Sequence, residues 1–277
     1  MTTIDAALPE IRRAVRAWLR EYAPDGRVCV ALSGGADSLA LTAATAREAQ
    51  DAIALIVDHG LQDGSGAVAE RAADQAMRLG CSAAHVIPVQ VDGPGGMEAA
   101  ARRVRYDALD AARGGLPVLF AHTLDDQAET VLLGFGRGSG ARSIRGMGAW
   151  SRPWGRPLLG IRRAQTRAAC TALGLDPHDD PHNRDPRFTR VRLRREVLPL
   201  LEDVLGGGAA GALARTAAQL REDDAVLVDL AGSLLERARI AADGARAGVD
   251  LDVRVLAAGA PPVRRRVLRA WLLDHDA

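Results

Sequence analysis

The stretch VCVALSGGADS, residues 28–38, decides the fold of this chain. Its five leading apolar residues predict a buried strand, its two glycines permit a tight turn, and helical periodicity begins at Asp37. A strand, a glycine turn and a helix in this order leave backbone amides at the helix N-terminus free to bind an anion. The hydroxyls of Ser33 and Ser38 add two donors. We therefore predict a phosphate-binding loop here.

Asp37 is the unexpected member of this loop. A carboxylate beside a phosphate group repels it unless a magnesium ion lies between them. The same residue in the same place is also suited to cap the helix that follows. The local pattern leaves both roles for Asp37 open.

Outward from this loop, short apolar strands alternate with amphipathic helices. This alternation predicts an α/β fold with a doubly wound, mainly parallel sheet. Asp58 and His122 each follow a predicted strand, as Ser33 does, so we expect all three at the carboxyl edge of the sheet. The further strands are expected at 53–57, 84–89 and 117–120, and the helices at 4–21, 37–49, 67–79, 98–112 and 124–133.

The second half of the chain has a different character. Residues 134–148 hold six glycines among arginines, which predicts a mobile loop. Helices are expected at 163–173 and 190–204, with Pro199 bending or ending the second one, and again at about 209–246 and 261–273. We predict two domains, a catalytic domain over 1–205 and a smaller helical C-terminal domain over 206–277.

Charge is distributed unevenly along the chain. All 36 basic residues counted as Lys+Arg are arginine, and the net charge is +1. Residues 137–195 hold 14 arginines against four acids, or +10, and the remainder of the chain carries −9. This segregation favours a basic surface that binds a polyanion, with nucleic acid as the expected partner. Arginines spread over several solvated faces are the alternative.

Several classes of protein are disfavoured by composition. The three cysteines lie far apart, which argues against a disulfide framework, a zinc site or a paired redox centre. No apolar run approaches the roughly 20 residues that span a bilayer, and the first 21 residues predict a helix rather than a signal peptide. We expect a cytoplasmic protein with no membrane partner.

A second group of polar residues is HTLDDQAET, residues 122–130. Asp125 and Glu129 are four residues apart on a predicted helix and share a face. They stand at a helix start beside the sheet edge, where a cation–phosphate cluster is expected, although simple capping remains an alternative. His59 suits a phosphate contact or a turn. Glu98 and Arg102 suit a site or a surface ion pair.

Seven motifs occur in sequence between residues 28 and 201: SGGADS, VDHGL, MEAAARRVRY, HTLDDQAET, RGSGARSIRGM, RPLL and DPHNRDPRFTRVRLRREVLPLL. The first resembles the signature of the ATP-pyrophosphatase, or PP-loop, superfamily. The whole set resembles the tRNA(Ile)-lysidine synthetase family, which implies an adenine-nucleotide α-hydrolase-like fold.

The resemblance implies an enzyme that uses ATP and Mg²⁺. Members adenylate the C2 oxygen of the wobble cytidine in isoleucine tRNA with a CAU anticodon, and free L-lysine then displaces AMP to give lysidine. The implied catalytic residues are Asp37, Asp125, Asp126 and Glu129, with Asp37 and Asp125 on the metal. The implied ATP-binding residues are Ser33, Gly34, Gly35, Ala36, Asp37, Ser38, Asp58, His59, Arg105 and His122. The candidate RNA contacts are Arg137, Arg142, Arg145, Arg190, Arg192 and Arg194.

The chain departs from the family pattern at two points. Arg190-Val191 replaces the usual Arg-Asn pair, and a further C-terminal domain for the acceptor stem has no counterpart, so a C-terminal truncation at Ala277 stays open. The oligomeric state, a homodimer included, is also open. The alternatives are a tRNA thiolase of the same superfamily, a small-molecule adenylating ligase and a non-enzymatic RNA-binding module.

Overall fold

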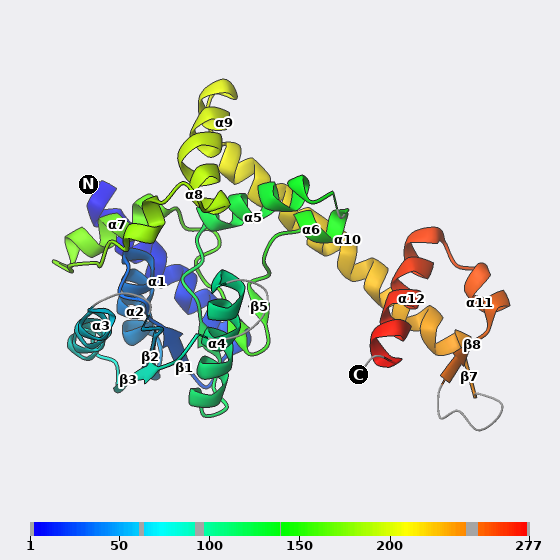
Figure 1. Cartoon of the computed structure of the whole chain (residues 1–277), viewed down its shortest axis with the longest axis horizontal. Coiled ribbons are helices and arrows are strands. Elements are labelled where there is room, and N and C mark those ends of the chain that lie inside the picture. Colours follow the sequence, from blue (N-terminus) through cyan, green and yellow to red (C-terminus); the bar gives the residue numbers. More distant parts are fainter. Residues whose placement is uncertain (1–2, 61–63, 92–96, 139, 242–248, 276–277) are drawn as a thin grey trace. The chain divides into compact units, whose positions relative to one another are not determined.

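In the computed structural model, the first part of the chain forms a six-stranded sheet with helices on both faces (Figure 1). The structure describes residues 3–60, 64–91, 97–138, 140–241 and 249–275. The strand order is β3-β2-β1-β4-β6-β5, and the pairs are parallel except β5 with β6. The predicted α/β, mainly parallel sheet is confirmed. The strands are β1 (Arg27–Ala31), β2 (Asp51–Asp58), β3 (Ala83–Pro88), β4 (Val118–Leu119), β5 (Trp150–Ser151) and β6 (Trp154–Gly155).

The inner residues of β1 and β2 are apolar because both faces of the sheet are covered. Val28 and Val30 of β1 pack into one core, while Cys29 and Ala31 pack into the core on the other face. The first core is closed by α1 (Thr3–Tyr22), α2 (Ala36–Glu48), α3 (Ser65–Leu79) and α7 (Arg163–Ala172), and the second by α4 (Met97–Ala112).

The strand order places a topological switch point at β1. The chain passes from β1 to β2 and β3 on one side, and then returns to β4 on the other side of β1. Ligands of open α/β sheets bind outside the carboxyl ends of the strands at such a point. The loop after β1 and the segment after β4 therefore border one crevice, where the sequence analysis expected Ser33 and His122.

The glycine-rich segment 134–148 is more ordered than predicted. Helix α5 (Leu124–Gly136) extends into it, and α6 (Ala141–Ile144) lies within it. A Cβ on Gly134 would lie 2.2 Å from the backbone oxygen of Ser143, so glycine permits the two helices to approach closely. The prediction of an irregular mobile loop was wrong for the described residues of α5 and α6, because Gly134 serves packing rather than turning.

The helix predicted over 190–204 is divided into three parts. α8 (Thr189–Arg192) passes into a π-helical turn (Leu193–Val197), and α9 (Leu198–Val204) follows. Pro199 lies in the first turn of α9, where its missing N–H costs no hydrogen bond. It therefore does not end α9, which continues to Val204. A short 3₁₀ helix (Pro181–Arg184) precedes α8.

The C-terminal part is helical with one small hairpin. α10 (Ala209–Ala238) ends before the predicted residue 246, and β7 (Arg239–Ala241) pairs antiparallel with β8 (Val249–Leu251). The hairpin was missed because a three-residue strand is stabilised by its partner rather than by local pattern. α11 (Val253–Ala257) and α12 (Pro261–His275) follow.

By the contacts between its residues, the chain divides into two compact units. One comprises Met1–Leu133 with Met147–Ala214, and the other Gly134–Gly146 with Arg215–Ala277. The domain limits 1–205 and 206–277 remain a prediction. Among the described helices, none is by itself both long and apolar enough to cross a membrane; residues 189–204 and α10 meet that condition of length and composition only as a pair, across a bend of 96°.

Candidate active site

The loop after β1 is shaped by its glycines and serines. Gly34 has φ +81°, a left-handed conformation that other residues rarely adopt. The backbone amide of Ser33 donates to Ser38 Oγ at 3.2 Å, and Ser38 Oγ donates to the oxygen of Gly35 at 2.9 Å. The N-cap of α2 is Gly35, with no side-chain cap, so the first amides of the helix remain available to an anion. The loop therefore has the form of a phosphate cradle.

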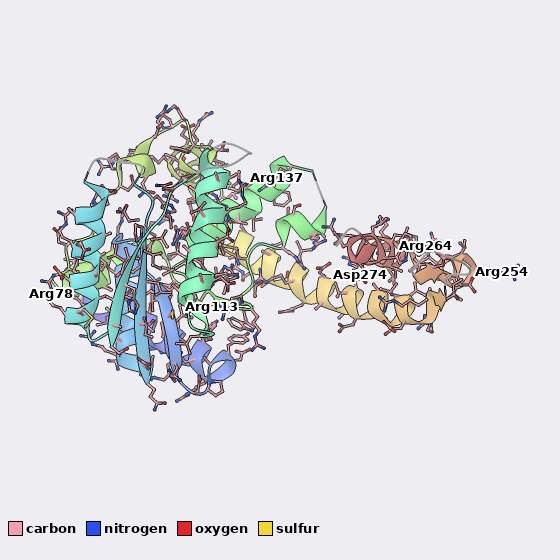
Figure 2. The ribbon with its side chains drawn as sticks, turned by 60° about the horizontal axis from the view of Figure 1, so that its bottom comes forward. Arg78, Arg113, Arg137, Arg254, Arg264 and Asp274 are labelled. Carbon is pink, nitrogen blue, oxygen red and sulfur yellow. The ribbon has the colours of Figure 1, made fainter. Side chains whose placement is uncertain are left out.

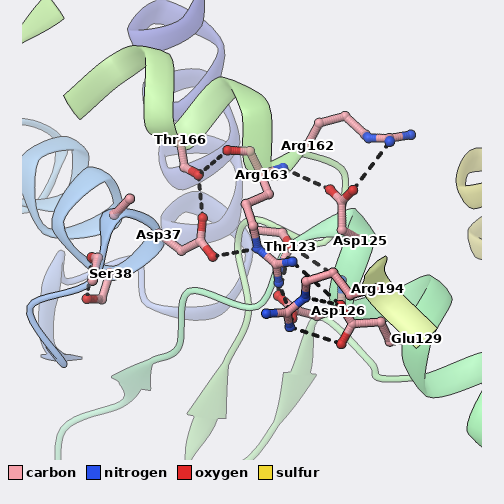
Figure 3. Close-up of polar contacts among 12 residues, drawn as sticks. Asp37, Ser38, Thr123, Asp125, Asp126, Glu129, Arg162, Arg163, Thr166 and Arg194 are labelled. Atoms are coloured by element: carbon pink, nitrogen blue, oxygen red, sulfur yellow. Dashed lines mark hydrogen bonds and ion pairs between the residues drawn. The ribbon is translucent and has the colours of Figure 1, made fainter. Parts of the chain in front are cut away.

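Asp37 does not cap α2. Its carboxylate accepts a hydrogen bond from Thr166 Oγ1 and contacts Arg163 Nε at 3.1 Å, both from α7 (Figure 3). Burial raises the pKa of Asp37, and the contacts with Thr166 and Arg163 oppose that rise. The side chain is thus held across the crevice, away from its own helix.

Asp126 stands opposite, in the first turn of α5. The amide and the hydroxyl of Thr123 both donate to Asp126 Oδ2 at 2.8 Å, while Arg163 Nη2 lies 2.6 Å from Oδ1. Burial alone would raise the pKa of Asp126, but Arg163 and the Thr123 hydrogen bonds outweigh it and lower the pKa. Arg163 therefore links the carboxylates of Asp37 and Asp126.

Glu129 lies one turn further along α5 and is fully buried. Arg194 makes a forked contact with it, Nε to Oε1 at 2.7 Å and Nη2 to Oε2 at 3.1 Å. Arg163 and Arg190 lie farther from the same carboxylate, at 3.5 and 3.8 Å. Three guanidinium groups thus surround this buried carboxylate and compensate its charge.

Asp125 is held on the outer side of the cluster. Its Oδ2 accepts from the backbone amide of Arg163 at 2.8 Å, and its Oδ1 lies 3.3 Å from Arg162 Nη2. The guanidinium of Arg163 connects Asp37 to Asp126, whereas Asp125 contacts only the backbone amide of Arg163. Asp37 and Asp125 remain the predicted metal ligands, and Asp126 is the carboxylate that shares the Arg163 guanidinium with Asp37.

A cavity of about 330 Å³ opens beside the loop at the ends of β1 and β2. Four predicted ATP-binding residues line it, namely Ser33, Asp58, His59 and Arg105, and His178 and Asp180 complete one wall. Arg105 stacks its guanidinium over Phe120 at 5.4 Å from the ring centroid. The cavity combines apolar strand ends with a few polar groups, as small-molecule sites do.

His122, a predicted ATP-binding residue, follows β4 and is not among the residues that line the cavity. Its ring stacks on Phe120, with centroids 5.5 Å apart, and its Nδ1 is buried without a partner among the described residues. Burial lowers the pKa of His122 to about 4, and nearby Arg156 and Arg105 act in the same direction while Asp126 opposes. The imidazole is therefore neutral at pH 7.

The free energy of unfolding is expected to fall as the pH is lowered from about 6.5 towards about 4, since unfolded histidine takes up a proton in this range and native His122 does not. Urea unfolding at several pH values measures this slope. His122→Gln should flatten it. An equal slope in the variant would contradict the assignment.

The candidate RNA arginines have different surroundings. Arg190 and Arg194 reach the acidic cluster, and Arg192 pairs with Glu196 on the surface. Arg137 and Arg142 are exposed, and Figure 2 shows Arg137 just beyond the end of α5. RNA contact by these residues remains a prediction.

Arg145 belongs to a buried ion-pair network in the second compact unit. It pairs with Asp224 of α10, which also contacts Arg266 of α12. Burial would raise the pKa of Asp224, but Arg266 and Arg145 outweigh it and lower the pKa. This network attaches the segment 134–146 to α10.

Asp224→Asn is expected to destabilise the second unit by about 2–3 kcal/mol, because it leaves two guanidiniums without their carboxylate. Hydrogen exchange of 134–146 and of α10 should rise together. Asp229→Asn, on the same helix, is the control. Unchanged exchange in the Asp224 variant would contradict a structural role for Arg145.

Sequence reasoning missed Arg163, Thr166 and His178. One signal was available: Arg162 and Arg163 begin α7, where the helix dipole disfavours cations. Two arginines at such a place indicate carboxylate partners elsewhere. The partners themselves lie 37 and 126 residues away, which no local pattern reveals.

The donor set suits a hard cation. Mg²⁺ binds through one or two carboxylates together with substrate phosphates, and Asp37 and Asp126 supply two such oxygens beside the loop. Their link through Arg163 places both at the crevice. The residues present therefore fit a magnesium–phosphate complex.

The chain matches the model of the PP-loop domain over residues 8–201. It is 64% identical over 273 residues to "tRNA(Ile)-lysidine synthase" of Rhodococcus opacus (strain B4), covering 99% of this chain and 82% of that protein. The protein of the same name from Mycobacterium tuberculosis (strain CDC 1551 / Oshkosh) is 58% identical over 273 residues, with 98% and 83% covered.

Among solved structures, the U34-tRNA thiolase NcsA from Methanococcus maripaludis is similar with a TM-score of 0.62 at 18% identity, covering 79% of this chain and 80% of that one. This likeness shows the shared fold alone. The sequence matches, together with the loop and the acidic cluster, show that the chain belongs to the tRNA(Ile)-lysidine synthase family.

Proposed function

We propose that this enzyme adenylates the C2 oxygen of the wobble cytidine in isoleucine tRNA with a CAU anticodon, and then joins free L-lysine to C2, giving lysidine, AMP and pyrophosphate. The observation that supports this best is the placement of a phosphate loop, an acidic cluster and a nucleotide-sized cavity at one sheet edge. The loop suits the phosphates of ATP, the cavity suits its adenosine, and the acidic cluster suits lysine.

ATP is proposed to lie along this edge. The cavity between the ends of β1 and β2 receives the adenosine, with Arg105 and His59 beside it. The amides of the loop and the hydroxyls of Ser33 and Ser38 hold the phosphates. Mg²⁺, held by Asp37 with Asp125 or Asp126, neutralises phosphate charge when bound.

The acidic cluster is proposed to receive lysine. Asp126 and Glu129 attract the ε-ammonium, but the attacking amine must be unprotonated, so a base is needed. Burial lowers the pKa of His122 to about 4, which makes its imidazole a weak proton acceptor and disfavours it as this base. Adenylation turns the C2 oxygen into a good leaving group, and loss of AMP follows the attack.

The RNA is proposed to approach over the arginine-rich segment, since phosphate contacts by arginine supply affinity without reading sequence. The wobble base must leave its stack to reach the crevice, as single-stranded anticodon bases readily do. The proposed compartment is the cytoplasm.

A thiolase would need a reactive thiolate, and the cysteines here do not suit that chemistry. Cys29, Cys81 and Cys170 are buried. Burial raises the pKa of each thiol to about 11. A thiol of that pKa is protonated at pH 7 and reacts slowly.

Incubation with ATP, labelled lysine and an unmodified CAU-anticodon isoleucine transcript tests the proposal. We expect label in the RNA, with one pyrophosphate released per lysine. An elongator methionine transcript, which also carries CAU, serves as the control. Pyrophosphate release with small acids in place of tRNA, and no lysine incorporation, would instead identify a small-molecule ligase.

A further inference from the structure

Arg163 occupies an unusual position in the acidic cluster. Its guanidinium contacts Asp37 at 3.1 Å, Asp126 at 2.6 Å and Glu129 at 3.5 Å, and its backbone amide donates to Asp125 (Figure 3). One residue thus contacts all four predicted catalytic carboxylates. Its side chain is only 16% exposed, so these contacts are poorly screened by water.

The negative charge of the cluster is already largely compensated. Its four carboxylates are joined by ion pairs to four guanidiniums, one of which, that of Arg162, also pairs with Glu202. The guanidiniums belong to Arg162, Arg163, Arg190 and Arg194. A divalent cation entering a compensated cluster gains little unless one of these cations gives way.

Arg163 is the cation whose place a metal would take. It alone lies between Asp37 of the loop and Asp126 of α5, whereas Arg162 contacts Asp125 from outside and Arg194 chiefly contacts Glu129. It starts α7, where the helix dipole disfavours a positive charge, so its position depends on the anions it contacts. A phosphate group would serve as such an anion equally well.

We propose that Arg163 is a resident counter-cation that gives up Asp37 and Asp126 to Mg²⁺ and transfers its guanidinium to the phosphates of the arriving ATP. Arg163 is then a positioning residue in the empty enzyme and a phosphate ligand in the loaded one. The chain has no lysine that could serve instead. This inference rests on the proposed use of a magnesium–ATP complex at this edge.

If Arg163 moves from the carboxylates to the phosphates in this way, Arg163→Gln should have opposite effects on metal affinity and on ATP affinity. Removing the competing charge should tighten binding of Mn²⁺ alone, followed by electron paramagnetic resonance, by at least about tenfold. Removing the phosphate ligand should weaken binding of ATP at saturating Mg²⁺, followed by calorimetry, by at least about fivefold. Arg167→Gln, on an exposed site of the same helix, should change neither affinity.

If Arg163 only holds the carboxylates together and does not exchange partners, a different result is expected. Mn²⁺ affinity would then stay equal or fall in Arg163→Gln, and either result overturns the proposal, as does unchanged ATP affinity. Arg163→Lys covers a failure of the glutamine variant to fold: an ammonium cannot bridge two carboxylates as a fork does, so Mn²⁺ affinity should still exceed that of the wild type. Neither assay contains tRNA or lysine, so both can succeed when lysine incorporation fails.

Discussion

Asp37→Ala is expected to lower tRNA-dependent ATP–pyrophosphate exchange by at least about 1,000-fold, since loss of the proposed metal ligand would remove several kcal/mol of transition-state stabilisation. The affinity for tRNA should stay within about twofold, because phosphate contacts by arginine do not involve this carboxylate. Exchange of labelled pyrophosphate into ATP measures the first quantity, and filter binding measures the second.

Two variants separate this effect from general damage. Asp37→Asn keeps the shape and removes the charge, and it should be as inactive as the alanine variant. Asp110→Ala changes an exposed acid that pairs with Arg113, and it should leave exchange unchanged. Exchange that persists in both Asp37 variants would show that the metal is held elsewhere.

Glu129→Gln is expected to lower the free energy of unfolding by about 3 kcal/mol, because it leaves the guanidinium of Arg194 facing a neutral amide in a buried site. Arg194 is 28% exposed, and water compensates part of the loss. Lysine incorporation should also fall by at least about 100-fold if this carboxylate attracts the ammonium. Urea unfolding and the labelled-lysine assay measure the two effects.

The chain offers a matched control for this substitution. Glu196 makes a forked contact with Arg192, but both side chains are at least half exposed, so Glu196→Gln should leave the free energy of unfolding nearly unchanged. The double variant Glu129→Gln, Arg194→Gln should be less destabilised than the sum of its parts. Equal costs for Glu129→Gln and Glu196→Gln would contradict the assigned burial.

The fold was predictable because its signals are local. β1 and β2 are continuous apolar runs, and Gly34 marks the turn between β1 and α2. The two-residue strands β5 and β6 were missed: β6 pairs with β4, more than 30 residues earlier in the chain, and β5 joins the sheet through β6. A strand of two residues is too short to show a recognisable sequence pattern, whatever its composition.

The candidate site was predictable in its acids and less so in its arginines. Asp125, Asp126 and Glu129 share one helix turn, which helical spacing reveals. The charge excess of 137–195 indicated RNA, yet Arg163 and Arg194 from that segment face carboxylates. Counting charges along a chain shows where cations are abundant and does not show which anion each one meets.

The three buried thiols have a practical consequence for following this enzyme at work. Because maleimide reagents attack thiolates, the native protein should label slowly at neutral pH, and rapid labelling would report loss of structure. A single cysteine introduced at exposed Arg142 would then be the one fast site on a folded molecule. Fluorophores could be attached there without first deleting any natural sulfur.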